Sequence, residues 1–375
     1  MEILRIGIVG AGRMGRIRAH SARAFPGCRV VQVADTVSES AEALAKEVGC
    51  EAGRDWERLV ARTDIDAVVV ATPHKYLAPI TIAALQAGKH VFCEKPMART
   101  VAEADEILTC HRSSPQALVV GFTLRHHPAI ARARELLFEG AIGEPFYVRG
   151  SYGHGGRPGY EREWRADAEL AGGGELLDQG IHLIDLSRWF LGDFREVSGL
   201  AATFFWGTEN GAEATGANGW PAPAREPVDD NAFVLLRTRG GRVASLHASW
   251  TQWKNRFSFE VFGRDGFLVV DGLGGSYGLE RLTKGRRSRT GGRPELEELA
   301  FGGAVVGGSS PSVDDVWSRE WSAFRAAILT RESSSRGVGR PVPTVSASAC
   351  DARQALRVVQ TLYEMPAQAL TELSD

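Results

Sequence analysis

The chain has 375 residues, which favours two domains, and its 43% hydrophobic and 24% charged residues are typical of a globular protein. A net charge of −2, no apolar run near the roughly 18 residues of a membrane span, and no secretory signal at the start predict a protein without nucleic-acid or membrane partners. The five cysteines form no C-x-x-C pair, so we expect reduced thiols in a cytoplasmic protein.

Residues 1–122 alternate short apolar runs with helical stretches. Near-continuous Val, Ile and Ala strands joined by helical crossovers are typical of a parallel sheet covered on both faces. This alternation predicts an α/β fold that begins with a Rossmann dinucleotide-binding domain over residues 1–122. Strands are predicted near 3–10, 28–35, 65–72, 89–94 and 117–123, and helices near 14–24, 38–48, 77–87 and 101–112.

The pattern changes after this domain, because strands now follow one another without helices between them. The Gly-Gly pair at 240–241 and the Asp-Gly pair at 265–266 are two-residue hairpin signals. We predict a substrate-binding and oligomerisation α+β domain over 123–375, with an open, mostly antiparallel sheet. Strands are expected near 196–205, 231–250 and 256–272, and helices near 130–138, 175–191, 316–329 and 351–364, of which the last can pack back near the first domain.

Two segments, 207–227 and 284–312, are predicted to be loops. The second begins "KGRRSRTGGR", and it is interpreted as solvated because no aromatic residues are interleaved for base stacking. A subordinate hypothesis is that Arg286, Arg287 and Arg289 receive a phosphorylated or nucleotide-linked sugar.

A glycine motif, G-x-G-x-x-G, lies between the first strand and the first helix. Gly10 permits a tight turn, Gly12 lets a pyrophosphate approach the backbone, and Gly15 lets helix and strand pack closely. Arg13 and Met14 complete the motif at the helix N-terminus, where free N–H groups favour phosphate. The motif therefore predicts a dinucleotide site.

Asp35 follows twenty residues after the last glycine, at the end of the second strand. A carboxylate there accepts hydrogen bonds from ribose hydroxyls and repels a 2′-phosphate. The three residues that follow supply no arginine to offset that repulsion, so NAD is favoured over NADP. Arg13 in the glycine turn weakens this preference.

The stretch "CEKPM" sends a lysine out of a buried strand. Pro96 limits the backbone freedom of Lys95, and the carboxyl edge of a parallel sheet is where such folds bind ligands. Lys95 is therefore expected beside the cofactor.

A second cluster lies in "GGGELLDQGIHLID", where Asp178, His182 and Asp185 are spaced i, i+4 and i+7. On a helix these residues form one stripe, and its apolar surroundings predict partial burial. Gly180 costs a helix roughly 1 kcal/mol relative to Ala, which suggests a close neighbour.

Three interpretations of this cluster remain open. A carboxylate can simply hold a core His182; the residues can form a metal site, although the ligand set is thin; or His182, oriented by Asp178, can act as a general acid–base. The dinucleotide domain upstream favours the third, because hydride transfer leaves a hydroxyl proton to be removed. No metal is expected.

Taken together, these motifs resemble the Gfo/Idh/MocA family of sugar and polyol oxidoreductases. The resemblance runs through "GIVGAGRMG", "ATP", "AALQAGKHVFCEKPMA", "GFTLRHHP", "GGGELLDQGIHLID" and the closing "YEM" helix, and so covers both predicted domains. The combination of E-K-P with D-x-x-x-H is its most specific part. One departure is that His74 and Leu77 stand where the family commonly has Asn and His.

The resemblance implies roles for individual residues. Lys95 and His182 meet the reacting carbon with Asp178 nearby, and the Lys95–Pro96 bond is a candidate for the cis form. The implied cofactor contacts beyond the glycine turn are Thr72, Pro73, His74, Glu94, Lys95, Trp164 and Arg165, and the implied substrate contacts are Lys95, Arg125, His127, Arg165, Asp178 and His182.

The function that the resemblance implies is NAD-dependent hydride transfer to or from a secondary alcohol or ketone of a sugar, cyclitol or nucleotide sugar. Two alternatives stay open: an NAD-dependent glycosidase on the same fold, and a non-catalytic dinucleotide-sensing regulator. Family members usually pair through the second domain's sheet, so a homodimer or homotetramer is expected.

Overall fold

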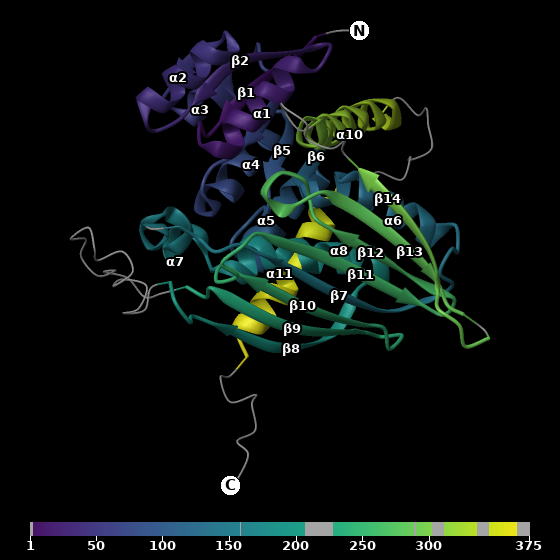
Figure 1. Cartoon of the computed structure of the whole chain (residues 1–375). Coiled ribbons are helices and arrows are strands. Elements are labelled where there is room, and N and C mark those ends of the chain that lie inside the picture. The colour runs from purple at the N-terminus through teal and green to yellow at the C-terminus, as the bar shows by residue number, and fades with distance from the viewer. Residues whose placement is uncertain are drawn as a thin grey trace. The chain divides into compact units, whose positions relative to one another are not determined.

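The computed structural model describes residues 3–157, 159–206, 228–288, 290–301, 311–335 and 345–365. The chain divides into two compact units (Figure 1). Unit 1 comprises Met1–His126 and Asp314–Arg353, and unit 2 comprises His127–Val313 and Gln354–Asp375. The predicted loop 207–227 lies outside the described residues.

Unit 1 contains a six-stranded parallel sheet in the order β3-β2-β1-β4-β5-β6, which is the Rossmann order and confirms the predicted fold class. Because every strand is parallel, the carboxyl ends of all six meet at one edge. The strands are β1 (Leu4–Val9), β2 (Cys28–Ala34), β3 (Glu51–Gly53), β4 (Ala67–Val70), β5 (His90–Glu94) and β6 (Leu118–Gly121).

The helices of unit 1 match the predicted ones and add a short helix. This extra helix, α3, is too short to show a periodic pattern, and it begins because the Asp55 carboxylate accepts hydrogen bonds from two backbone N–H groups of its first turn. The helices are α1 (Arg13–Ala24), α2 (Ser38–Val48), α3 (Trp56–Ala61), α4 (Leu77–Gln86), α5 (Val101–Arg112) and α10 (Pro311–Ser335), with 3₁₀ turns η1 (His74–Tyr76) and η2 (Thr123–His126).

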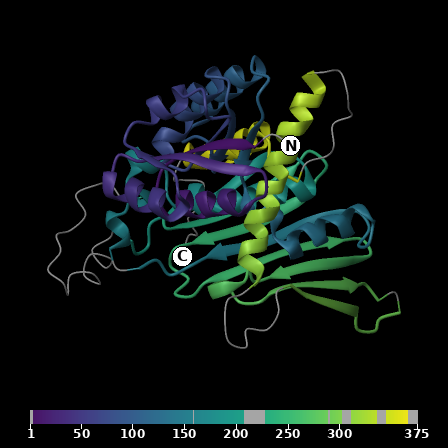
Figure 2. The ribbon, with the colours of Figure 1, turned by 90° about the horizontal axis from the view of Figure 1, so that it is seen from above.

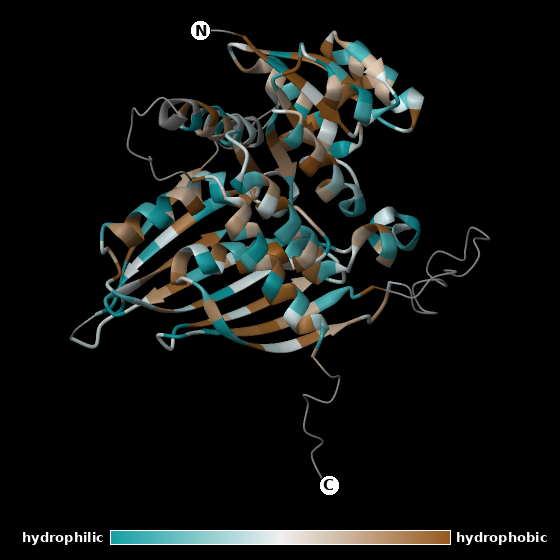
Figure 3. Cartoon of the chain, turned by 180° about the vertical axis from the view of Figure 1, so that it is seen from behind, coloured by the Kyte–Doolittle hydropathy of each residue, from teal (hydrophilic) through white to brown (hydrophobic). Residues whose placement is uncertain are grey.

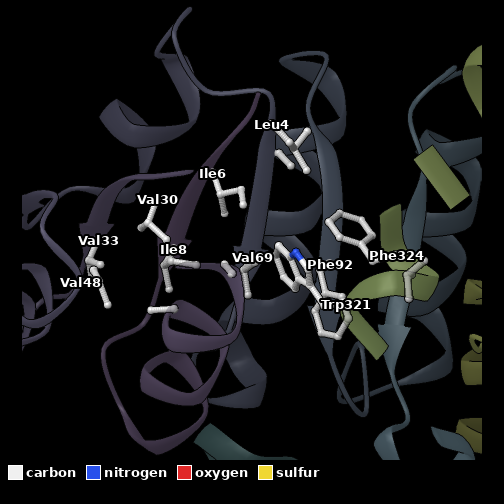
Figure 4. Packing of buried hydrophobic residues seen from close by; sticks show 14 of the residues in the cluster. Leu4, Ile6, Ile8, Val30, Val33, Val48, Val69, Phe92, Trp321 and Phe324 are labelled. Carbon is white, nitrogen blue, oxygen red and sulfur yellow. The ribbon is translucent and has the colours of Figure 1, made fainter. Parts of the chain in front are cut away.

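The core of unit 1 combines early and late parts of the sequence. Figure 2 shows α10 as one long helix, and Figure 4 shows its Trp321 and Phe324 beside Phe92 of β5. The ring of Phe92 lies 5.6 Å from that of Phe324, edge to face, and 6.3 Å from that of Trp321. A helix that follows the first segment of unit 2 in the sequence therefore completes the hydrophobic core of unit 1.

Unit 2 contains an eight-stranded sheet in the order β14-β13-β12-β11-β7-β10-β9-β8, antiparallel except for the pair β7 and β10. The antiparallel pairs β9–β10 and β11–β12 confirm both predicted hairpins, but the turns differ from the predicted pairs: residues 239–242 connect the first hairpin, and Arg264 and Asp265 connect the second. The strands are β7 (Pro145–Gly153), β8 (Phe194–Ala202), β9 (Asn231–Thr238), β10 (Val243–Ser249), β11 (Arg256–Gly263), β12 (Gly266–Asp271), β13 (Glu280–Arg286) and β14 (Glu295–Phe301).

One face of this sheet is covered by helices (Figure 1). α8 packs on β7 and β10, and α6 packs on β12 and β13. Along β9 the covered Val234 and Leu236 alternate with the exposed Phe233 and Leu235, so the opposite face carries apolar side chains too, and Figure 3 shows apolar stretches along these strands. The helices are α6 (Pro128–Phe138), α7 (Ala168–Ala171), α8 (Ile181–Leu191) and α11 (Ala349–Tyr363), the last continuing from unit 1.

The prediction that 284–312 is a loop is wrong in part. β13 extends to Arg286 and pairs with β14, whose side chains are almost all exposed. β14 was not predicted because a solvated edge strand has no buried apolar face. This strand is held instead by backbone pairing with β13 and by contacts such as that of Lys284 with Glu297 at 2.6 Å. Arg289 and residues 302–310 lie outside the described part of the chain.

None of the helices within the described ranges is long and apolar enough to cross a membrane.

Candidate active site

The glycine turn has the geometry that its sequence predicts. Gly10 has a φ of 101°, and a Cβ there would lie 2.4 Å from the carbonyl oxygen of Ala71. A Cβ on Gly15 would lie 1.8 Å from the carbonyl oxygen of Gly10, so helix and turn can pack only through glycine. A Cβ on Gly12 would meet no atom within 4 Å, which leaves the backbone open to a ligand just before α1 begins with Arg13 and Met14.

Asp35 lies directly after β2, beside this turn. One oxygen of its carboxylate accepts a hydrogen bond from the N–H of Ala11 at 2.7 Å, and the other accepts one from Val37 at 2.9 Å. The two backbone groups hold the carboxylate next to the glycine turn, at the carboxyl edge of the sheet.

A third feature of this edge is the segment after β4. The hydroxyl oxygen of Thr72 is buried and makes no hydrogen bond within the described residues, which costs free energy unless a ligand satisfies it. Pro73 precedes the turn η1, where His74 is buried. An open glycine turn, a held carboxylate and an unsatisfied hydroxyl at one sheet edge fit a bound dinucleotide.

Lys95 leaves β5 at the same edge. The Lys95–Pro96 peptide bond is cis, as the resemblance suggested. The next residue, Met97, is fully buried with a φ of 78°, a left-handed conformation that is rare for a side chain of this kind, and its N–H donates to the carbonyl of Glu94. Unusual backbone conformations of this sort concentrate at functional sites.

The other predicted residues of unit 1 have charged partners. The buried Glu94 carboxylate accepts a hydrogen bond from Nε of Arg18 at 2.6 Å. The buried Arg125 guanidinium lies 3.6 Å from the carboxylate of Asp351.

In unit 2, Asp178 and His182 lie on a helix that is not regular throughout. Residues Leu176–Gly180 form a π-helical turn before α8 begins, so the predicted i, i+4, i+7 stripe of a regular α-helix is wrong at Asp178. A π turn changes the angle between successive side chains, and such turns are frequent at functional sites. Asp178, His182 and Asp185 are all buried, as expected.

Gly180 has close neighbours, as its position suggested. A Cβ there would lie 3.2 Å from the Leu176 side chain and 3.5 Å from Ala248 of β10. The close approach is therefore made by the protein itself.

The structure brings Arg165 and Asp178 together. Nε of Arg165 lies 3.3 Å from an oxygen of Asp178, and its guanidinium lies over the ring of Trp164 at 4.5 Å. Burial alone would lower the pKa of Arg165, but the negative charge of Asp178 raises it overall. Arg165 therefore remains a cation beside the Asp178 carboxylate.

Two residues, Asp229 and Tyr363, hold the start of this helix, and neither was predicted as a site residue. The Asp229 carboxylate accepts hydrogen bonds from the N–H groups of Gly174 and Leu176 at 2.9 and 2.8 Å, and the Tyr363 hydroxyl donates to it at 2.7 Å. A Cβ on Gly174 would lie 1.9 Å from the carbonyl oxygen of Asp229. Glycine is therefore required at position 174, because any side chain there would clash with Asp229. The sequence drew attention to Tyr363 only as part of the "YEM" helix in the family resemblance.

Aromatic residues near His182 were also missed. The ring of Tyr152 on β7 lies edge-on to His182 at 6.1 Å, and Tyr277 lies against Tyr152 at 5.6 Å. Burial, followed by nearby charges such as that of Asp178, raises the pKa of Tyr152, so its hydroxyl stays protonated. Tyr152 could not be predicted as a neighbour of His182, because an aromatic residue on the buried side of a strand does not indicate which helix will pack against it.

His127 has a fully buried acidic partner. Its Nδ1 lies 3.0 Å from one oxygen of Glu280, and the other oxygen accepts a hydrogen bond from the N–H of Ala129 at 2.6 Å. This contact ties the start of α6 to β13. Among the described residues, no group of three or more His, Cys, Asp or Glu side chains is arranged to hold a metal ion.

Two family models match the chain. One, described as "Oxidoreductase family, NAD-binding Rossmann fold", matches residues 4–122, and the other, "GFO/IDH/MocA C-terminal domain", matches residues 130–269. A levoglucosan dehydrogenase from Pseudarthrobacter phenanthrenivorans is 32% identical over 72% of this chain and 74% of its own. An inositol 2-dehydrogenase from Rubrobacter xylanophilus is 28% identical over 84% of this chain and 87% of its own.

Solved structures extend the similarity to nearly the whole chain. A levoglucosan dehydrogenase in complex with NADH and L-sorbose has a TM-score of 0.80 and 25% identity, covering 97% of this chain and 96% of that one. An oxidoreductase domain protein from Kribbella flavida has a TM-score of 0.78 and 28% identity, covering 97% of each chain.

Proposed function

Because the chain belongs to the GFO/IDH/MocA family of oxidoreductases, we propose that it transfers a hydride between NAD and a secondary alcohol or ketone of a sugar, cyclitol or nucleotide sugar. The observation that carries this proposal is the glycine turn with its held carboxylate, at the sheet edge where Lys95 emerges. The buried Asp178, paired with the half-buried Arg165, and the buried His182 would supply the groups that handle the proton.

The first part of the proposal concerns the cofactor. When bound, NAD supplies the hydride acceptor, and the residues of this chain orient it. The glycine turn would hold its phosphates and Asp35 its ribose hydroxyls. The proposed cofactor contacts are Gly10, Gly12, Arg13, Met14, Gly15, Asp35, Thr72, Pro73, His74, Glu94, Lys95, Trp164 and Arg165.

The second part concerns proton transfer. In the oxidation direction His182 accepts the substrate hydroxyl proton while the C–H bond breaks, leaving a ketone; in reverse it returns that proton to the carbonyl oxygen. Lys95 hydrogen-bonds the same oxygen and stabilises its developing negative charge. Asp178, paired with Arg165, orients His182 or the substrate, with Arg125 and His127 as further proposed substrate contacts.

The names of the relatives support the substrate class, since levoglucosan dehydrogenase and inositol 2-dehydrogenase denote a sugar and a cyclitol as substrates of those proteins. The test is a screen for NAD reduction with free sugars, cyclitols, sugar phosphates and nucleotide sugars, with the Lys95→Ala variant as the blank. A substrate oxidised by the wild type and not by the blank supports the proposal. The proposal is contradicted if the wild type and the blank reduce NAD at equal rates with every substrate, or if the wild type reduces NAD with no substrate.

Cofactor choice provides one prediction. Asp35→Asn keeps the side-chain shape and removes the charge that repels a 2′-phosphate, so the preference for NAD over NADP in kcat/KM is expected to fall about tenfold or more, the equivalent of roughly 1.4 kcal/mol. Steady-state kinetics with both cofactors measure this ratio. Asp55→Asn, which removes the carboxylate at the start of α3, is the matched control and should leave the ratio unchanged. An unaltered preference in Asp35→Asn would mean that another residue selects NAD.

Oligomeric state provides another. We expect a homodimer or homotetramer, because the face of the sheet that carries Phe233 and Leu235 exposes large apolar side chains, with Leu235 51% accessible. Light scattering at micromolar concentration should give a mass of at least two chains. Leu235→Glu places a charge on this face and should lower that mass. Leu299→Glu on the edge strand β14 is the control, and it should lower the mass less. A monomeric wild type would contradict the expectation.

A further inference from the structure

Arg18 is a buried cation that the scheme above does not use. It lies on α1, one turn after the glycine motif, and its side chain is only 1% exposed. Its guanidinium lies between two aromatic rings, 4.3 Å from the centre of Phe92 and 4.9 Å from that of Trp317. A charge at this depth requires partners of opposite sign.

Two glutamates provide them. Nε of Arg18 donates to Glu94 at 2.6 Å, and Nη1 donates to Glu320 of α10, also at 2.6 Å. Thr123, at the start of η2, donates its hydroxyl to the same Glu320 oxygen at 2.9 Å. The cluster, which we call the Arg18 triad (Arg18, Glu94 and Glu320), joins α1, the end of β5 and α10.

The triad contains two acidic groups and one basic group. Two carboxylates surround one guanidinium, and the side chains of Glu94 and Glu320 are 8% and 0% exposed. Burial raises the pKa of Glu94, and the positive charges of Arg18 and, less strongly, Lys95 oppose that rise. Arg18 is thus the main partner that compensates the buried Glu94 carboxylate.

Stability is an insufficient reason for such a cluster. A buried ion cluster is often no more stabilising than apolar side chains of the same shape, and α10 already contributes Trp321 and Phe324 to an apolar core at this place. What the triad adds is a fixed position: Glu94 is the last residue of β5, and its carbonyl accepts the N–H of Met97 across the corner that carries Lys95.

We propose that the Arg18 triad is a positioning unit for Lys95. Arg18 anchors the Glu94 side chain and thereby the corner after β5 that carries Lys95, while Glu320, supplied by α10, holds the other side of the Arg18 guanidinium. The proposal deepens the dehydrogenase assignment and rests on it for the catalytic role of Lys95. Lys95 and the three members of the triad all belong to unit 1.

The first test measures Lys95 directly and needs no substrate. The purified full chain is labelled with trace amounts of an amine-reactive reagent, and the labelling of Lys95 relative to the exposed Lys46 is quantified by mass spectrometry. In Glu320→Gln the Arg18 guanidinium loses its charged partner on α10, so the corner that Arg18 anchors loosens and the relative labelling of Lys95 is expected to rise about threefold or more. Glu320→Asp, which keeps the charge, should remain close to the wild type.

The second test is kinetic. Glu320→Gln is expected to lower kcat about tenfold with the KM for NAD changed less than about threefold, and Glu320→Asp should restore part of the loss. Asp66→Asn, which removes a carboxylate from the Arg5 ion pair of the same unit, is the matched control for losing a salt bridge. Thermal melts of all variants verify folding; if Glu320→Gln does not fold, Thr123→Val replaces it, since it removes only a hydroxyl that supports the triad.

The outcomes distinguish failure of the positioning role from failure of the dehydrogenase assignment. Unchanged Lys95 labelling in a folded Glu320→Gln overturns the positioning role, even if kcat falls. Altered labelling with an unchanged kcat also overturns it, because the triad would then affect Lys95 without affecting catalysis. If no sugar or cyclitol reduces NAD, the dehydrogenase assignment fails, while the labelling ratio still decides whether Lys95 is coupled to the triad.

Discussion

Lys95→Ala is expected to lower kcat/KM about 10²- to 10³-fold, or roughly 3–4 kcal/mol of transition-state stabilisation, which is the usual effect of removing one preorganised donor to a developing oxyanion. Because the alkoxide charge exists mainly in the transition state, the loss should appear in kcat more than in the KM for the substrate. Initial rates of NAD reduction with a substrate from the screen measure it.

The control for Lys95→Ala is Lys46→Ala on the exposed side of α2. It should leave kcat/KM unchanged within about twofold. Binding of NAD to Lys95→Ala, measured by calorimetry, should remain, since the glycine turn and Asp35 are untouched. A Lys95→Ala enzyme with near wild-type kcat would remove Lys95 from the chemistry and would favour a non-catalytic, dinucleotide-sensing role.

His182→Asn is expected to have an effect of similar or larger size. Removal of a positioned general base costs about 10²- to 10⁴-fold in rate, and Asn keeps a polar group in the buried site without a group that can exchange a proton. The pH dependence of kcat/KM should lose the ionisation that belongs to His182 in the wild type. Rates across a pH series with wild type and variant provide the measurement.

His247→Asn is the matched control for His182→Asn. His247 is a half-buried histidine of β10 that stacks on Phe233 at 4.3 Å, on the sheet face without helices. Its replacement should leave the rate and its pH profile intact. If His182→Asn and His247→Asn behave alike, His182 is a core histidine held by its neighbours, which is the structural interpretation that its sequence context left open.

Short-range patterns in the sequence predicted a large part of this protein. The parallel strands, the glycine turn and both hairpins follow from residues within a few positions of one another, since a strand alternates, a turn requires glycine at a positive φ, and a Pro restricts the residue before it. The same reasoning selected Gly10, Asp35 and Lys95, which the structure assigns to one sheet edge because parallel strands end together.

Local patterns were less informative where several local states compete. The π turn at Leu176–Gly180 differs from an α-helix by a single hydrogen-bond step, and its start is held by Asp229, a residue far away in the sequence. The edge strand β14 has no buried face, so its sequence resembles a loop until β13 pairs with it.

The sequence by itself determined the fold class and nominated the chemical groups, because these depend on local conformational preference and on residue type. The tertiary structure alone decided what holds those groups. Arg18 meets Glu320 across 302 positions, and Tyr363 meets Asp229 across 134. A buried charge or hydroxyl needs a partner because it has lost its contacts with water. The sequence does not indicate which residue that partner is, since the two can lie at any spacing along the chain.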